Sequence, residues 1–377
     1  MSITNEQNNE VKILLAGKAH REWSNYRIDS SLQTPADAWS VSLGLPDGQF
    51  PPQVEPGAEV KVMIGNDVVM LGQIDEVSHS VARQATLSIS GRDLIAVLLD
   101  SSAPIFVAKE ITIEEVIANV VRPLGVSKIE IRSDTAPITS EKINIEPGMT
   151  AWDALETAAA ANGLWPWLEP DGTLVVGGPD YTITPVATLF LNKDGNNNNV
   201  ESLEYTRSVA DRYSEVTVLA QSHGIGAKGA NNIKGVANDP DMKVHRPYIS
   251  ISSDVANTDE AKKRAMKIMS DSRLNAVTVT VVVNGHRTSS GELWTPGQRV
   301  EIKSDVHGLD EVWFLMARTF TGGREEPTRT ELTFKEDGIW SIEAYKAKQP
   351  KAKAGKNKGK RKTDSKKGKL TPIIIDV

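Results

Sequence analysis

The stretch EVKVMIGNDVVMLGQIDEV, residues 59–77, decides the fold class of this chain. Apolar and polar residues alternate in two runs, which are joined by Gly65-Asn66-Asp67. Alternation with a period of two places every second side chain on one face of a sheet, and Gly, Asn and Asp are typical of tight hairpin turns. The stretch therefore predicts a β-hairpin in a β-rich region.

The residues around this hairpin extend the β pattern. AWSVSLGL (38–45) and ATLSIS (85–90) alternate in the same way. A short helix-like stretch, GRDLIAVLLDSSA (91–103), then follows, with an apolar face at Leu94, Ile95, Leu98 and Leu99. We predict a first β domain over residues 1–100.

Residues 101–180 change to a helical period. Thr112 and Glu115 form a capping-box pattern at the start of a helix over 111–126, and Thr150 is the expected N-cap of a second helix that stops at Asn162-Gly163. KIEIR (128–132) and the segments around the 170–172 turn read as strands. These elements predict a small α+β domain.

From residue 181 to 345 the chain returns to β. A Gly/Asn-rich stretch at 222–242 predicts a mobile loop, and one long amphipathic helix begins near Asn257, with Ala261, Ala265, Ile268 and Met269 on its inner side. We treat 222–275 as an insertion into a second β domain. The expected strands of this domain lie within 200–221, 277–287, 293–304, 311–323 and 329–336. Two β regions of similar size are thus separated by an α+β piece.

Composition excludes several kinds of chemistry. The 377 residues contain no cysteine, so disulfides and thiolate metal sites are not available. The N-terminus lacks the basic region of a signal peptide, and no apolar run reaches the roughly 20 residues of a membrane helix. We therefore expect a protein that folds in a cytoplasm.

No catalytic pattern stands out. The six histidines show no metal-ligand spacing, neither H-E-x-x-H nor G-x-S-x-G occurs, and GIGAKG (224–229) lacks the rest of a phosphate loop. Trp165 and Trp167 could line a sugar groove, although packing of a strand against a helix is the commoner use of such a pair. We predict no enzyme activity, no cofactor and no metal site.

The order of several motifs resembles one known family. The stretches that carry the resemblance are SISGRDLIAVLLDSSA (88–103), ITIEEVIANVVRPLGV (111–126), PGMTAWDALETAAAANGLWPWLEPDGTLVV (147–176), EAKKRAMKIMSDSRLNAVTVTVVVNGH (260–286) and LWTPGQRVEI (293–302). In this order they resemble the baseplate hub proteins of contractile-tailed phages, most closely the Mu-like tail protein family. The resemblance spans most of residues 1–345, and its strength lies in the order and spacing of the motifs.

The resemblance implies a β-rich α+β fold with two tube-type β-barrel domains, an α+β insert and a helix-containing peripheral segment. It implies a non-catalytic homotrimeric ring in the virion tail baseplate, which adapts the six-fold tail tube to the three-fold central spike and forms part of the DNA channel. Tube or distal tail proteins, the spike and other baseplate proteins are the expected partners, with at most non-specific contact to DNA. The positions that match the family pattern, expected to define the fold or an interface, are Gly91, Arg92, Asp93, Trp294, Pro296 and Gly297.

The C-terminal end is electrostatically separate. Residues 346–369 hold twelve Lys/Arg and one Asp, so the remainder of this chain of net charge −6 carries −17. An acidic channel lining and a generally acidic surface both fit that excess. The run predicts a flexible tether, followed by a strand-like end, 370–377, whose docking candidates are Ile373, Ile374 and Ile375.

The sequence alone leaves other functions open for the chain and for its basic C-terminal run. The basic run could instead bind DNA or an anionic membrane, or act only as a solubilising end. At the level of the whole protein, the alternatives are a tail-associated cell-wall hydrolase and a DNA-binding tail-completion protein that acts through the basic C-terminal run.

Overall fold

The computed structural model describes residues 9–15, 18–45, 54–82, 85–104, 111–132, 145–162, 164–220, 233–252, 255, 257–324 and 326–340. The chain divides into two compact units, Met1–Arg207 with Val277–Asp337, and Ser208–Ala276 with Gly338–Val377.

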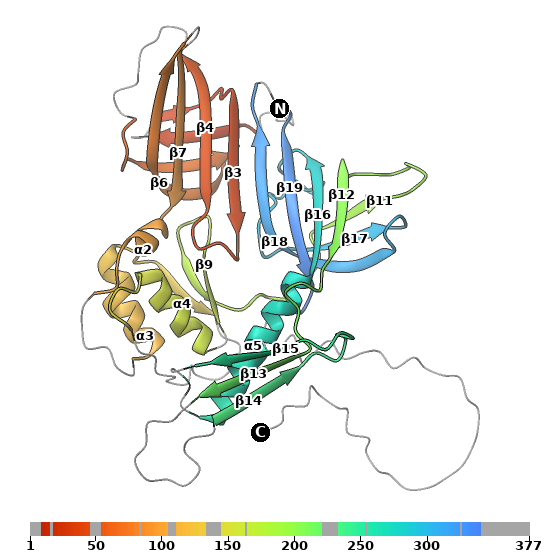
Figure 1. Ribbon diagram of the computed structural model, residues 1–377. Helices are drawn as coiled ribbons and strands as arrows, with labels where there is room; N and C mark the ends of the chain where they lie inside the picture. Colours follow the sequence, from red (N-terminus) through yellow and green to blue (C-terminus); the bar gives the residue numbers. More distant parts are fainter. Residues whose placement is uncertain are drawn as a thin grey trace. The chain divides into compact units, whose positions relative to one another are not determined.

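Unit 1 is built on a 13-stranded sheet, in which the predicted hairpin is present as β5 and β6 (Figure 1). The strands of its first part are β1 (Val11–Leu15), β2 (Lys18–His20), β3 (Asn25–Ser31), β4 (Ala38–Leu45), β5 (Glu59–Ile64), β6 (Asp67–Val81) and β7 (Ala85–Asp93). Those of its second part are β11 (Ala187–Leu191), β12 (Ser202–Arg207), β16 (Val277–Asn284), β17 (Arg299–Ser304), β18 (Leu309–Gly322) and β19 (Arg329–Glu336).

The two parts of the sheet repeat one arrangement of strands. The first part has the spatial order β3-β4-β7-β6-β5-β1, and the second has β12-β16-β19-β18-β17-β11. The corresponding strands also follow the same order along the chain: β1, β3, β4, β5, β6 and β7 in the first part, and β11, β12, β16, β17, β18 and β19 in the second. The outermost pairing differs, because β1 runs antiparallel to β5 whereas β11 runs parallel to β17. We name the parts module 1 (residues 11–93) and module 2 (187–207 with 277–336).

The repeat extends to local geometry. The ladder of β6 with β7 skips Asp75, and the ladder of β18 with β19 skips Met316, at equivalent places. A β-bulge of this kind bends and twists its strand, so both modules curve at the same point. A Pro-Gly turn precedes the equivalent strands β5 and β17, with Gly57 at φ 86° and Gly297 at φ 96°.

The apolar faces of both modules share one core. The largest fully buried side chains include Trp39, Phe320 and Phe334, and β6 and β18 have inward positions that alternate with half-buried or exposed ones. Hydrogen bonding among the described strands leaves the sheet open rather than closing either module into a ring. The observed fold is thus β-rich α+β, with two equivalent curved modules.

The α+β piece between the modules has its own core. It contains α2 (Ala96–Asp100), α3 (Ile113–Val116), a π-helical turn (Ile117–Val121), a 3-10 turn (Arg122–Leu124), α4 (Ala151–Ala161) and a sheet in the order β8-β10-β9. The strands of that sheet are β8 (Ile129–Arg132), β9 (Trp165–Leu168) and β10 (Leu174–Gly177).

Helix capping in this piece follows the sequence. The capping box of Thr112 and Glu115 is confirmed, and Thr150 is confirmed as an N-cap, with Asp153 completing a second box that the sequence reading did not predict. The helix expected within 111–126 begins as α3, continues as a π-helical turn and a 3-10 turn, and ends where the sequence predicts, at Pro123 and at Gly125, which takes the left-handed conformation. One expectation is wrong, that Leu94 lies on the apolar face of a helix. Leu94 is 39% exposed, because β7 runs to Asp93 and the helix begins only at Ala96.

Unit 2 is a three-stranded sheet backed by one helix. Its order is β14-β13-β15, from β13 (Glu215–Ala220), β14 (Ile233–Asn238) and β15 (Pro247–Ile251), and α5 (Thr258–Ala276) packs on one face. A Cβ on Gly235 would lie 2.3 Å from the backbone carbon of Ala261, so glycine lets helix and sheet touch. β14 contradicts the prediction of one loop over 222–242, since its small and alternating residues fit under α5. Residues 221–232 lie outside the described part.

The inner face of α5 was predicted nearly correctly. Ala261, Ala265 and Met269 are buried, but Ile268 is only partly buried and Met266 takes an inner position instead. Of the helices that the structure describes, none is long and apolar enough to span a bilayer.

Candidate functional site

Module 1 and module 2 meet along one strand pair. The second half of β18 (317–322) pairs antiparallel with β3, which is the first strand of module 1 (Figure 1). The Thr319 hydroxyl donates to Asp29 Oδ1 at 2.6 Å across this seam. The seam thus joins two copies of the module within one chain.

A buried polar pair secures the end of the seam. Tyr26 Oη lies 2.8 Å from His286 Nε2, and His286 Nδ1 lies 3.1 Å from Thr330 Oγ1. Burial, with the charges of Arg318 and Arg287, lowers the pKa of His286 to about 3, and burial raises the pKa of Tyr26 to about 12. Both groups are therefore neutral near pH 7, and this contact between β3 and module 2 is a hydrogen bond rather than an ion pair.

Arg318 places a buried cation at the same seam. Arg318 is only 3% exposed. Its Nη1 donates to the Ile28 carbonyl at 2.9 Å, and its guanidinium lies 3.9 Å from the centre of the Phe320 ring. Burial lowers its pKa to about 10, while the charges of Asp37 and Asp29 act in the opposite direction. The guanidinium therefore stays charged at neutral pH.

The predicted residues Gly91, Arg92 and Asp93 lie together where β7 leads into α2. A Cβ on Gly91 would sit 1.9 Å from the Gln73 carbonyl oxygen, so only glycine fits this crossing of β7 and β6. Arg92 binds Asp75 at 2.6 Å and Asp100 at 2.7 Å, and these hydrogen bonds raise its pKa. Arg92 thereby ties the bulge of β6 to the end of α2.

Asp93 is a buried carboxylate with backbone donors. Oδ1 accepts from the Ile95 amide at 2.9 Å and Oδ2 from the Asp37 amide at 3.0 Å. Burial, and then the charge of Asp37, raise the pKa of Asp93 to about 8, while burial raises that of Asp37 to about 6. Burial disfavours the charge on each acid, and the two negative charges repel each other, so the pair retains a proton near pH 7.

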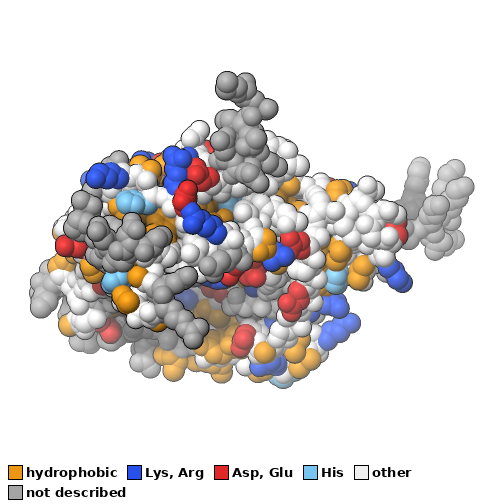
Figure 2. Space-filling model, turned by 90° about the horizontal axis from the view of Figure 1, so that it is seen from above, with side chains coloured by type: hydrophobic (Ala, Val, Ile, Leu, Met, Phe, Trp, Pro, Cys, Tyr) orange, Lys and Arg blue, Asp and Glu red, His pale blue; other side chains and the backbone are white. Residues whose placement is uncertain are grey.

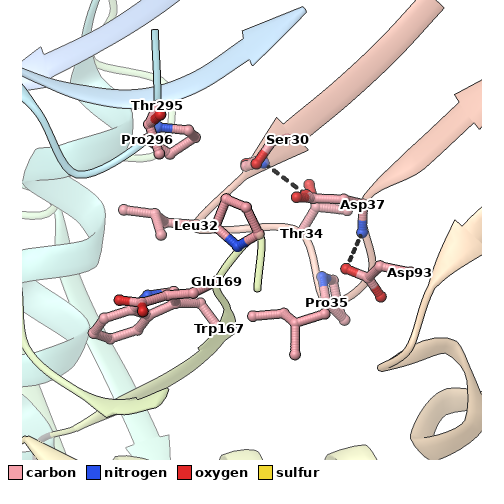
Figure 3. A pocket seen from close by; sticks show the side chains of 13 residues that line it. Ser30, Leu32, Thr34, Pro35, Asp37, Asp93, Trp167, Glu169, Thr295 and Pro296 are labelled. Atoms are coloured by element: carbon pink, nitrogen blue, oxygen red, sulfur yellow. Dashed lines mark hydrogen bonds between the residues drawn. The ribbon is translucent and has the colours of Figure 1, made fainter. Parts of the chain in front are cut away.

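A cavity of about 110 Å³ lies beside this pair, where three parts of unit 1 meet (Figure 3). The loop after β3 contributes Leu32, β9 contributes Trp167, and the turn before β17 contributes Pro296. Trp165 Nε1 donates to the Leu32 carbonyl at 2.6 Å and fixes β9 to that loop. The cavity marks a junction of elements; within the described residues no group of three or more His, Cys, Asp or Glu could hold a metal ion.

Trp294, Pro296 and Gly297 form the turn that opens β17. Gly297 N–H donates to the Leu315 carbonyl at 2.8 Å, and in module 1 Gly57 N–H donates to the Ile74 carbonyl at 2.7 Å. Trp294 is buried (3% exposed), as is its module 1 counterpart Val54. The turn is therefore a repeated structural feature. The docking candidates Ile373, Ile374 and Ile375 lie outside the described residues.

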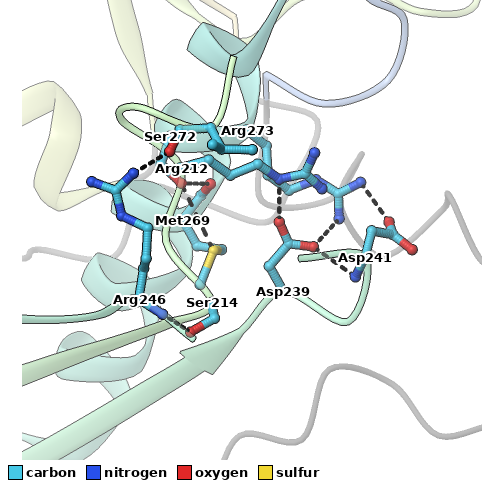
Figure 4. A network of polar contacts seen from close by, with 9 residues as sticks. Arg212, Ser214, Asp239, Asp241, Arg246, Met269, Ser272 and Arg273 are labelled. Carbon is cyan, nitrogen blue, oxygen red and sulfur yellow. Dashed lines mark hydrogen bonds and ion pairs between the residues drawn. The ribbon is translucent and has the colours of Figure 1, made fainter. Parts of the chain in front are cut away.

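Unit 2 has a charge network of its own (Figure 4). Asp239, whose side chain is fully buried, binds Arg212 at 2.7 Å and Arg273 at 3.3 Å, and Arg273 also binds Asp241 at 3.0 Å. The network links the end of β14 to α5. The face drawn in Figure 2 likewise shows acidic and basic side chains close to one another.

The strands that form the seam, β18 and β3, have equivalents elsewhere in the repeat. Residues 76–81 of β6 correspond to 317–322 of β18, and β12 corresponds to β3. Among the described strands, that part of β6 pairs with β7 alone and β12 pairs with β16 alone. Both edges are exposed, and Val81 is 71% exposed. The sequence suggested that contacts between copies come from strand edges, but it did not identify the residues of these two edges.

Comparison with known families matches four consecutive parts of the chain. Residues 10–93 match the Mu phage baseplate assembly protein GpP-like N-terminal model, and 95–178 match the second domain of the baseplate hub protein gp44-like model. Residues 212–269 match the third domain of the NMB1110-like tail protein, and 271–339 match a tail protein C-terminal domain. A repeated sheet module with these matches defines a phage tail baseplate protein.

Similar proteins narrow this class. A tail protein from Neisseria meningitidis MC58 is 40% identical, with a TM-score of 0.78 over 89% of this chain and 98% of that one. The 43 kDa tail protein of prophage MuSo2 from Shewanella oneidensis is 24% identical, with a TM-score of 0.74 over 87% and 98%. Baseplate hub protein gp44 of Escherichia phage Mu is 24% identical over 82% of this chain and 83% of its own length. The chain belongs to the family of Mu-like baseplate hub proteins, as its sequence motifs predicted.

Proposed function

We propose that three copies of this chain close into a ring that forms the hub of a contractile phage tail baseplate. The main support for this proposal is the repeated module. The seam within the chain joins β18 to β3, and the strands equivalent to these two, β6 and β12, each keep an open edge. Joining β6 of one copy to β12 of the next repeats the seam between copies. Three chains then present six modules, and closing the ring leaves neither of these edges exposed.

The internal seam supplies the register of the proposed interface. Within the chain Thr319 pairs with Asp29, and Gly322 pairs with Tyr26. Transferring these pairs through the repeat places Ser78 opposite Thr206, and Val81 opposite Leu203. The next copy would then cover Val81, just as β3 covers Gly322 in the seam. This burial would explain why a valine is exposed at a strand edge in the single chain.

The proposed ring resolves a mismatch of symmetry. The six modules of the ring match a six-fold tail tube, while its three chains match a three-fold spike. The ring performs this role through its shape and symmetry, and the role needs no catalytic group. Each curved module acts as a tube-type barrel domain that is completed by its neighbours, and the ring encloses part of the DNA channel in the virion. Tube, spike and other baseplate proteins are its partners.

Cysteine cross-linking tests the proposed interface, because the natural chain has no cysteine. The variant Ser78→Cys with Thr206→Cys should give covalent dimers and trimers on oxidation, since both residues are exposed and opposite each other. The matched control, Ser78→Cys with Glu204→Cys, lies two residues out of register on the same face and should cross-link far more slowly. Equal rates for the two variants, or monomers only, would contradict the interface.

A further inference from the structure

Unit 2 exposes an apolar strand edge that the proposed ring does not use. Of the ten large apolar residues that are exposed in the described part, six lie in unit 2. On β15 itself, Tyr248 is 39%, Ile249 63% and Ile251 84% exposed. Exposed side chains of this kind gathered on one edge mark a surface that another segment covers.

The backbone of β15 can accept a further strand. β15 pairs with β13 on one side, and among the described strands it has no partner on the other. Ser252 donates its amide to the Leu219 carbonyl of β13 at 2.9 Å. Amides of a strand alternate in direction, so those of Ile249 and Ile251 point away from β13, toward the open edge.

The side chains at this edge also form a row. Ile249 pairs in register with Thr217, and Ile251 with Leu219, on the face opposite to the residues that pack against α5. Leu219 is itself 37% exposed. An added strand with alternate aliphatic side chains would extend this row and cover Ile251.

The last described residues of unit 2 lie close to this sheet. Ile339 is buried, and its carbonyl accepts a hydrogen bond from the Ser270 hydroxyl in the middle of α5. Trp340, the last described residue, is 4% exposed. Because α5 packs on the sheet, the following residues start within the length of that helix, roughly 28 Å, of the β15 edge.

The chain beyond Trp340 has the length and sequence to occupy the edge. Leu370 follows Trp340 by thirty residues, and a tether of that length is expected to span about 30 Å. The segment 370–377, LTPIIIDV, has three consecutive isoleucines, and Pro372 fits the start of an edge strand. The segment 221–232 is a poorer occupant, because Ile225 is its one large aliphatic residue.

We propose that residues 370–377 add to β15 of their own copy as a further strand, which places Ile373 and Ile375 beside Ile249 and Ile251. The short reach raises the local concentration of the segment to about millimolar, so even weak strand pairing is populated. The basic run then forms a closed loop anchored at both ends. This inference does not depend on the ring.

Hydrogen exchange on the full chain tests the proposal directly. A chain that ends at residue 369 should exchange the amides of Ile249 and Ile251 at least tenfold faster than the full chain, while amides of β13 keep their rates. Equal exchange in the two chains would overturn the proposal, because the edge would then be open, or covered by something else.

Cross-linking tests which copy supplies the segment. Ile251→Cys with Ile375→Cys should oxidise to an intrachain disulfide about tenfold faster than the control Val306→Cys with Ile375→Cys, in which the first cysteine replaces another exposed residue. Equal rates would contradict docking at β15, and mainly interchain products would contradict docking within one copy.

Discussion

Replacing Asp93 by Asn should remove a pH dependence from the stability of this protein. Asp93 is 2% exposed, and its pKa of about 8 in the folded chain compares with 3.8 in an open one. The folded state therefore holds a proton that the unfolded state releases. The stabilisation is complete below about pH 4 and is lost as pH rises through about 8.

The size of the effect follows from that shift. One pKa unit corresponds to about 1.4 kcal/mol, so a shift from 3.8 to about 8 gives a ceiling of roughly 6 kcal/mol between pH 4 and pH 9. Asp93 lines the adjacent cavity, whose volume of about 110 Å³ is large enough for water, so the desolvation of Asp93 is incomplete and the effect is smaller than this ceiling. Asn keeps an oxygen for one backbone donor but turns its NH2 group toward the other, so the variant loses one hydrogen bond at every pH. Because Asn never ionises, the stability of the variant relative to the natural chain should rise between pH 5 and pH 8.5.

Denaturant unfolding at pH 5 and pH 8.5 measures this difference. The control is Asp100→Asn, which alters the same junction; hydrogen bonding from Arg92 lowers the pKa of Asp100, so this carboxyl does not titrate in the range. The difference between the Asp93 variant and the natural chain should change with pH by more than 1 kcal/mol, whereas the difference for Asp100 should not. If the Asp93 difference were the same at both pH values, the reasoning about the buried pair would be refuted.

Three further substitutions test other contacts. Arg92→Ala should cost about 1–2 kcal/mol of unfolding free energy and lower the yield of trimer, because two carboxylates lose their partner; an unchanged trimer yield on a sizing column would contradict this role. Gly235→Ala should cost about 1–3 kcal/mol in thermal unfolding, whereas Gly44→Ala, with open space around it, should be close to neutral. Tyr26→Phe should cost about 1–2 kcal/mol at pH 6 and pH 8 alike, because His286 is neutral at both; a cost that appears only at one pH would show that His286 titrates.

The sequence predicted those helices and strands well that are determined by residues close together in the chain. Alternation around residues 59–77, the capping box at Thr112 and the N-cap at Thr150 each depend on neighbouring residues, and the structure contains all three features. The strand β14 was missed because its pattern is short and glycine-containing, and its stability comes from α5, which follows it in the chain by about twenty residues.

The junctions could not be predicted in the same way. Tyr26 and His286 are 260 residues apart, and nothing near either residue indicates the other. One signal was available but was not used: E-P-G-A-E-V (55–60) and T-P-G-Q-R-V (295–300) share a Pro-Gly turn with the same spacing to the next strand. Aligning the two β regions on that turn would have given the repeat, although not the bulges or the exposed edges.

The mass of the protein in solution tests the central claim most directly. The proposed ring contains three copies, so light scattering or native mass measurement should give about 123 kDa, three times the 41.0 kDa chain. A stable species of one, two or four chains over a wide range of protein concentration would contradict the account.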